Sequence, residues 1–256
     1  MALIKKFTID SLNVKVFDTR LALGREAARE TASKIKELLL YNADINMIFA
    51  AAPSQNEFLE ALSGDTSIIW NRINAFHMDE YIGLEADTPQ RFASFLHEKI
   101  FARVAFKSIN YLDGNTEDIL AECRRYSGLL QRYPPHIVCM GIGENGHIAF
   151  NDPHEANFHD PDLVKVVELD EKCRMQQVHD GCFNHIDAVP MRAITLTIPA
   201  LMAGKFIYCA VPAATKAEAV FSVVTSEISE ACPASILRNH SNATLFLDLD
   251  SGKKLL

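Results

Sequence analysis

The stretch that decides the fold covers residues 137–147 and reads IVCMGIGENGH. Its first four residues are apolar, which is typical of a short buried strand. Glycines and polar residues follow at once and end at His147, so the strand leads into a turn that carries an imidazole. Residues 73–81 show the same order of a strand followed by polar residues, because an apolar run leads into Asp79 and Glu80. Ligands bind beyond the carboxyl ends of strands in open α/β sheets, so Asp79 and His147 are predicted to share one active site.

Strand-like and helix-like segments alternate on both sides of these two stretches. Strand patterns are predicted at 46–51, 163–169, 193–198, 206–211 and 244–249. Helical patterns are predicted from a cap at Asp18 or Thr19 to about residue 40, and at 56–62, 88–101, 117–130 and 216–224, with a short helix from Pro233. Such alternation predicts an α/β fold of three αβα layers, with a mostly parallel Rossmann-like sheet and helices on both faces. We found no repeat and no linker, so residues 1–256 are predicted to form a single domain.

Composition excludes several classes of function. The formal net charge of −8 argues against a nucleic-acid partner, which needs a clustered basic face. It leaves an anionic small substrate open, because a few lysines or helix N-termini can hold a phosphate. The six cysteines form no C-x-x-C pair and are predicted to be reduced thiols. With no leader pattern and no apolar run long enough to cross a bilayer, we expect a cytoplasmic protein without a membrane partner.

Two motifs together resemble one known family. Residues 78–84 read MDEYIGL and residues 146–153 read GHIAFNDP. In these motifs the chain resembles the glucosamine-6-phosphate deaminase/isomerase family, whose fold is shared by 6-phosphogluconolactonases, and the resemblance runs from about residue 49 to 246. The lactonase branch typically has Asp-Glu-Arg at the first motif, where this chain has Tyr81, and it lacks the Ile-Ala-Phe-Asn run that this chain keeps.

The resemblance implies an amino-sugar-6-phosphate deaminase/isomerase. Such an enzyme converts glucosamine-6-phosphate or galactosamine-6-phosphate to a ketohexose 6-phosphate and ammonia by ring opening and C2–C1 proton transfer. The implied partner is a small sugar phosphate, with no metal and no organic cofactor, and formation of a homo-oligomer stays open.

The resemblance also implies the catalytic roles. His147 opens the sugar ring, and its unperturbed pKa near neutrality suits a proton shuttle. Asp79 moves the C2 proton, and Glu80 supports the same loop and the substrate. The family usually has Asp-Gly-His followed five residues later by Glu; here the corresponding residues are Asn145 and Asp152, which we expect to orient His147.

Substrate binding departs from the family pattern in two places. The phosphate turn usually rich in glycine corresponds to residues 51–56, AAPSQN, in which Ser54, Gln55 and the following N–H groups are the donors. Lys216 matches the phosphate-binding lysine of the family. The family arginine has no clear match, and the nearest candidates are Arg174, Gln176 and Gln177, with Gly146 expected to contact the substrate from the histidine turn. A differently placed phosphate or another amino sugar is therefore an alternative.

Other interpretations of these residues remain open at the level of sequence. Asp79 and Glu80 fit a solvated turn, His147 fits a structural histidine, and Lys216 fits a surface lysine. The glycines at 141, 143 and 146 match a dinucleotide motif, but no helix start follows them. The histidines show no zinc-like spacing. Two other functions are compatible with the same scaffold: a lactonase acting on a 6-phospholactone, and a non-catalytic sugar-phosphate sensor.

Overall fold

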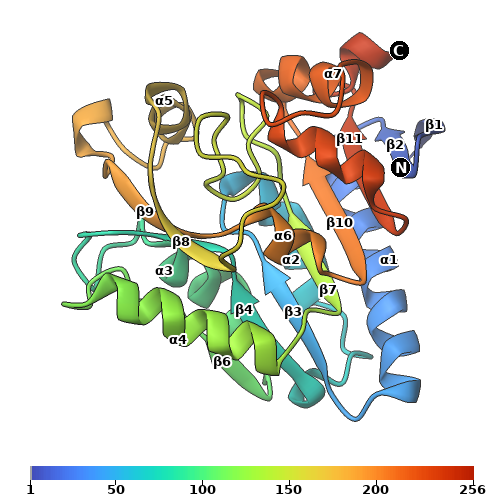
Figure 1. The fold of residues 1–256 in the computed structure, drawn as a ribbon. Helices are drawn as coiled ribbons and strands as arrows, with labels where there is room; N and C mark the ends of the chain where they lie inside the picture. Colours follow the sequence, from blue (N-terminus) through green and yellow to red (C-terminus); the bar gives the residue numbers. More distant parts are fainter. Residues whose placement is uncertain (1) are drawn as a thin grey trace.

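The computed structural model describes residues 2–256, and a sheet of eight strands forms its middle layer (Figure 1). The strand order is β1-β2-β11-β10-β7-β3-β4-β6. All neighbours in this sheet are parallel except β1 and β2, which pair as an antiparallel hairpin. The strands are β1 (Leu3–Ile9), β2 (Leu12–Phe17), β3 (Ile45–Phe49), β4 (Ile73–His77), β6 (Ser108–Asn110), β7 (Ile137–Met140), β10 (Phe206–Val211) and β11 (Ala243–Asp248).

Helices cover both faces of this sheet. Because side chains alternate along a strand, Cys139 of β7 packs on one face and Val138 and Met140 pack on the other. The first face is covered by α1 (Arg20–Tyr41), α2 (Asn56–Ser63) and α3 (Phe92–Leu96). The second face is covered by α4 (Ile119–Arg132), α6 (Ile198–Met202) and α7 (Ala217–Thr225). The predicted three-layer architecture is confirmed.

A second, smaller sheet lies beside the first and was not distinguished from it in the sequence. It consists of β5 (Asp79–Tyr81), β8 (Val164–Glu168) and β9 (Arg192–Leu196), all antiparallel to their neighbours. Asp79 pairs with Thr195 of β9 in this sheet. Strand β4 of the main sheet ends at His77, and β5 of the small sheet begins two residues later, after a bend at Met78. Asp79 therefore lies where the carboxyl end of β4 meets the small sheet.

One local prediction needs correction. Pro89 does not open a helix, because residues 88–91 form a turn and α3 begins at Phe92 after Arg91 as N-cap. The β1–β2 hairpin and helix α5 (Glu171–His179) were not predicted from the sequence.

Among residues 2–256, no helix combines the length and the apolar character that a bilayer crossing requires. All six cysteines are free thiols in the structure.

Buried His77 makes stability depend on pH. Its Nε2 accepts a hydrogen bond from Leu112 N at 2.8 Å, so Nδ1 carries the proton and donates to the Asp79 carbonyl at 2.9 Å. Burial lowers the pKa of His77 from 6.5 to about 4. The unfolded chain therefore takes up this proton first, and stability present above pH 6.5 is lost as the pH falls toward 4, by up to about 3 kcal/mol. Urea unfolding at pH 7.5 and 4.5 should show this loss, and it should be smaller in His77→Gln, which has no imidazole to protonate. An equal pH dependence in both proteins would contradict the assignment.

Candidate active site

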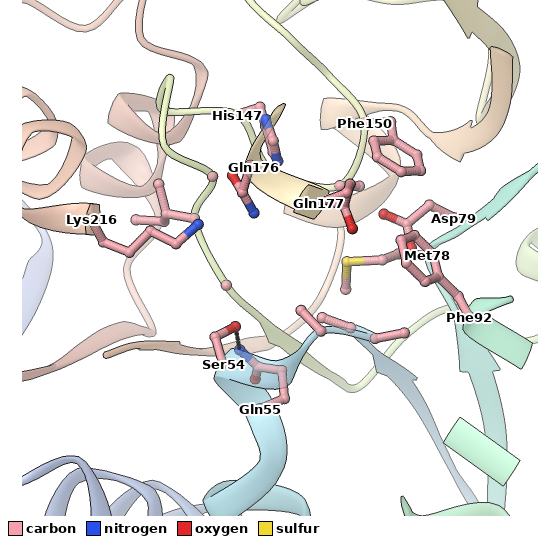
Figure 2. A pocket seen from close by; sticks show the side chains of 17 residues that line it. Ser54, Gln55, Met78, Asp79, Phe92, His147, Phe150, Gln176, Gln177 and Lys216 are labelled. Carbon is pink, nitrogen blue, oxygen red and sulfur yellow. Dashed lines mark hydrogen bonds between the residues drawn. The ribbon is translucent and has the colours of Figure 1, made fainter. Parts of the chain in front are cut away.

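Loops that follow four strands of the main sheet meet in a hollow at their carboxyl ends. The hollow has a cavity volume of about 60 Å³ and opens to solvent. It lies beyond β3, β4, β7 and β10, the place where open α/β sheets bind ligands. Figure 2 shows Lys216 and Asp79 on opposite sides, with His147 and the two glutamines of α5 above and Ser54 and Gln55 below. The lining residues are Ala50, Ala51, Ala52, Ser54, Gln55, Met78, Asp79, Phe92, Gly141, Ile142, Gly143, His147, Ala149, Phe150, Gln176, Gln177 and Lys216.

Asp79 is a buried carboxylate with a free oxygen. Its side chain is 7% exposed, and within residues 2–256 its Oδ1 has no hydrogen-bond partner. Burial raises the pKa of Asp79 well above 3.8, and the nearby charge of Glu80 adds to this effect. Phe92 and Phe150, whose ring centroids lie 5.5 Å apart, line the cavity with it and help to exclude water. A carboxylate in such surroundings has the properties of a general base for a C–H proton.

His147 lies in a tight turn and faces Asp152. The distance from His147 Nδ1 to Asp152 Oδ1 is 2.9 Å, and Asp152 is fully buried. Burial by itself raises the pKa of Asp152, but the contacts with His147, Asn145 and the backbone N–H of Asp170 together outweigh burial, and the pKa is lowered overall. Gly143 permits this geometry, because a Cβ there would lie 2.2 Å from the imidazole ring. Asp152 is thus the ion-pair partner of Nδ1, and Nε2 is the ring nitrogen that remains for a substrate.

Asn145 holds Asp152 and does not contact the imidazole through its amide. Its Nδ2 donates to Asp152 Oδ1 at 2.9 Å, and its Oδ1 accepts the backbone N–H of His147 at 3.1 Å. Asn145 and Asp152 were predicted to orient His147 together; in the structure Asp152 faces the ring, and Asn145 contacts Asp152 and the backbone of His147.

His147, Asp152 and Cys173 also bring one potential metal ligand each within 4.8 Å of one another. The thiol of Cys173 contacts Asp152, and burial raises the pKa of this thiol well above 9.0, which disfavours the thiolate that a metal ion needs. The donor set therefore fits a hydrogen-bonded cluster better than a metal centre.

Lys216 marks the end of the cavity that suits an anion. Its side chain is only 3% exposed, and no hydrogen-bond partner of its Nζ lies within residues 2–256. Burial lowers the pKa of Lys216. Ser54 and Gln55 line the same cavity, and Gln55 Nε2 is anchored by bonds to Ala210 O at 3.0 Å and Ser54 Oγ at 3.1 Å. A buried ammonium without a partner is costly unless a ligand supplies the counter-charge, so this end is built for an anionic group.

Three further predicted site residues lie outside the cavity lining. Arg174 points to the far side of α5, where its guanidinium donates to Ile186 O at 2.7 Å and Val189 O at 3.1 Å. Glu80 is fully buried and accepts the backbone N–H groups of Phe92 and Ala93, so it supports the loop and does not reach a substrate. Gly146, with φ of +85°, shapes the histidine turn.

The residues that sequence reasoning missed are uncharged. Phe92 and Phe150 reach the cavity from segments 58 residues apart in the chain; no local pattern marks Phe92, and Phe150 lies in the second motif but was given no role there. Gln176 and Gln177 were named as candidates, but the helix that carries them, α5, was not predicted. An acidic N-cap at Asp170 followed by Glu171 was the signal available for this helix.

Comparison with known proteins agrees with this geometry. The family model described as glucosamine-6-phosphate isomerases/6-phosphogluconolactonase matches residues 18–246. The chain belongs to this family. A glucosamine-6-phosphate deaminase of Listeria innocua is 31% identical over 229 residues, which cover 90% of this chain and 96% of that protein. A glucosamine-6-phosphate deaminase of Bacillus cereus is 35% identical over 181 residues, covering 71% of this chain and 67% of that protein.

Solved structures show the same fold. A structure described as a monomeric glucosamine-6-phosphate deaminase superposes with a TM-score of 0.85 at 31% identity, covering 94% of this chain and 98% of that one. The 6-phosphogluconolactonase of Thermotoga maritima gives a TM-score of 0.75 at 18% identity, covering 93% and 99% of the two chains. At that identity the lactonase supports the fold and does not bear on the reaction.

Proposed function

We propose that this chain deaminates and isomerises an aminohexose 6-phosphate, giving a ketohexose 6-phosphate and ammonia. The observation that carries the proposal is the layout of the cavity: a buried carboxylate at Asp79, an oriented imidazole at His147 and an unpaired ammonium at Lys216 line one hollow. The deaminases of Listeria innocua and Bacillus cereus named above support the same reaction.

The reaction needs three proton movements that these groups can supply. His147 first moves a proton from the anomeric hydroxyl to the ring oxygen, which opens the pyranose, and Asp152 stabilises the imidazolium that forms in passing. Asp79 then takes the proton from C2 and returns it to C1, while one proton of the C2 ammonium passes to O1, which converts the C1 aldehyde and the C2 ammonium into a C1 alcohol and a C2 iminium. Water adds to C2, and ammonia leaves. Lys216 with Ser54 and Gln55 holds the phosphate throughout.

The deciding experiment is an assay of ammonia release by the purified protein. Glucosamine-6-phosphate, galactosamine-6-phosphate and a 6-phosphogluconolactone are offered separately, and saturable ammonia release from one of the two amino sugars is the expected result. Lactone hydrolysis above the spontaneous rate without ammonia release would favour a lactonase instead. Thermal stabilisation by the amino sugars without turnover would identify a sensor.

Removal of the Lys216 charge should weaken substrate binding far more than catalysis. Lys216→Met keeps the length of the side chain, so we expect KM to rise about 10- to 100-fold, the scale of one charge-assisted hydrogen bond, with kcat changed much less. Steady-state kinetics of ammonia release measure both constants. Lys172→Met, on the exposed side of α5, is the matched control and should behave like the wild type. Equal KM values for wild type and Lys216→Met would exclude the phosphate role.

A further inference from the structure

Glu80 is a fully buried carboxylate whose two oxygens face hydrogen-bond donors. Its Oε1 accepts the backbone N–H groups of Tyr81 at 2.9 Å and Phe92 at 3.1 Å, and its Oε2 accepts that of Ala93 at 2.9 Å. Arg91 adds a fourth donor group, with its Nε 3.7 Å from Glu80 Oε2. A proton on either oxygen of Glu80 would have to point at a donor, so this arrangement requires the ionised form.

Arg91 is the cation next to this carboxylate. Its side chain is 13% exposed, and its Nε is buried without a hydrogen-bond partner within residues 2–256. Its Nη1 donates to Ala86 O at 3.1 Å, and its Nη2 lies 4.0 Å from Asp113, an exposed side chain whose charge solvent screens. The guanidinium is thus anchored in the loop before α3, next to Glu80, and it does not line the active-site cavity.

Glu80 needs a cation because a second buried carboxylate precedes it on β5. Burial raises the pKa of Asp79, and the charge of Glu80 adds to this effect. Burial also raises the pKa of Glu80, while its backbone N–H bonds and the charge of Arg91 act in the opposite direction. Neighbouring like charges that are buried disfavour each other's ionised form. Arg91 therefore supports the state in which both carboxylates are ionised.

The remaining ionisable side chains near the two carboxylates do not replace this charge. Burial lowers the pKa of the histidine of β4 to about 4, and it raises the pKa of two tyrosines and of the cysteine of α5 above their usual ranges. All four are therefore uncharged near neutral pH, while His147 and Lys216 reach the cavity from other sides (Figure 2). The four uncharged residues are His77, Tyr81, Tyr126 and Cys173.

The hydrogen bonds of Glu80 fix the start of α3 against β5. Arg91 is the N-cap of this helix, but its side chain makes no capping bond, and the carboxylate of Glu80 takes that place. The first residue of the helix, Phe92, lines the cavity and packs against Phe150, with 5.5 Å between the ring centroids. Loss of the charge on Glu80 would therefore release Phe92 from the strand that carries Asp79.

We propose that Arg91 is a positioning residue: it keeps Glu80 ionised, and ionised Glu80 holds the start of α3 and Phe92 in place beside Asp79. The proposal rests on the function proposed above, since it assumes that Asp79 is the base. It gives a role in catalysis to an arginine that lies outside the cavity lining and that was not predicted as a site residue.

Removal of the positive charge at position 91 tests the proposal through the pH profile. In Arg91→Met, Glu80 should take up a proton at a higher pH than in the wild type, so the acid limb of kcat/KM should move to higher pH. On that limb we expect a loss of about 10-fold, since one pKa unit changes the ionised fraction tenfold, with the alkaline plateau close to the wild-type value. Arg91→Lys keeps the charge and should keep the wild-type profile. Arg124→Met, which removes an exposed arginine of α4, is the matched control.

Three results would overturn the proposal. An acid limb that stays in place or moves to lower pH in Arg91→Met would mean that catalysis does not need ionised Glu80. An equal loss at every pH would mean that Arg91 only stabilises the fold. An Arg91→Lys protein with the profile of Arg91→Met would mean that the charge is not what matters.

The backbone amide of Phe92 reports the charge of Glu80 without turnover, because it donates to this carboxylate. In protein labelled with ¹⁵N-phenylalanine, its signal is identified by its loss in Phe92→Leu. The signal should titrate at a higher pH in Arg91→Met than in the wild type and in Arg91→Lys, and equal midpoints in the three proteins would reject the inference. If the wild type releases no ammonia, the reaction is wrong, and this titration still decides whether Arg91 keeps Glu80 ionised.

Discussion

Asp79→Asn should lower kcat for ammonia release by about 10³- to 10⁴-fold, the upper range for loss of a general base. The amide keeps the shape of the side chain but cannot accept the C2 proton. KM should change little, because the phosphate contacts at Lys216 lie across the cavity (Figure 2). Single-turnover kinetics with substrate deuterated at C2 measure the step directly: the wild type should show a primary isotope effect if C–H cleavage limits the turnover. Asp187→Asn is the matched control and should retain full activity.

The same substitution should make the protein more stable. Burial raises the pKa of Asp79 because an ionised carboxylate is costly in the folded state, and the neutral amide removes that cost. A higher Tm together with lost activity is expected of a residue that contributes to catalysis and destabilises the fold. Because the base must be ionised to act, kcat/KM should fall on the acid side of the pH profile. The raised pKa of Asp79 means that this fall should occur at a higher pH than an ordinary aspartate would give. An Asp79→Asn protein that keeps its activity, or loses it together with its Tm, would contradict the role of base.

Most of the fold could be predicted because both faces of the central strands are buried. A parallel strand covered by helices on each side must be apolar at nearly every position, which gives the short runs at β3, β7 and β10 their clear boundaries. The β1–β2 hairpin lacks this signal, since β1 is mostly exposed and carries adjacent lysines. Helix α5 lacks it too, because Gln176 and Gln177 are among the residues it buries and no apolar stripe marks its inner face.

The same difference separates the candidate site residues that could be predicted from those that could not. Asp79, His147 and Lys216 follow apolar strands directly, so topology alone brings them to one edge of the sheet. Arg174 was a reasonable candidate for the anion end, but the rotation of α5 turns it to the carbonyls of Ile186 and Val189. A charge near the right place in the sequence cannot be assigned to a cavity until the helix that carries it has a known face.

His147→Gln should reduce kcat about 10²- to 10³-fold, the middle of the range for a proton shuttle. Glutamine can occupy the space and accept a hydrogen bond, but it cannot carry a proton between the anomeric hydroxyl and the ring oxygen. The variant is left with the small fraction of substrate that opens its ring without help, so turnover should follow the spontaneous opening rate and rise with buffer concentration. Ammonia release in a series of buffer strengths measures this. His159→Gln, an exposed histidine outside the cavity, is the matched control.

The pairing of His147 with Asp152 predicts that substitutions at the two residues have non-additive effects on kcat. Because Asp152 contributes through the imidazole it orients, Asp152→Asn should also lower kcat, and adding it to His147→Gln should cost little more. Fully multiplicative losses would mean that the two side chains act on separate steps, and Asp152 would then need a role of its own in the cavity. Its complete burial and its bonds to Asn145 and Asp170 leave it no direct path to a substrate, so the non-additive outcome is the one this geometry requires.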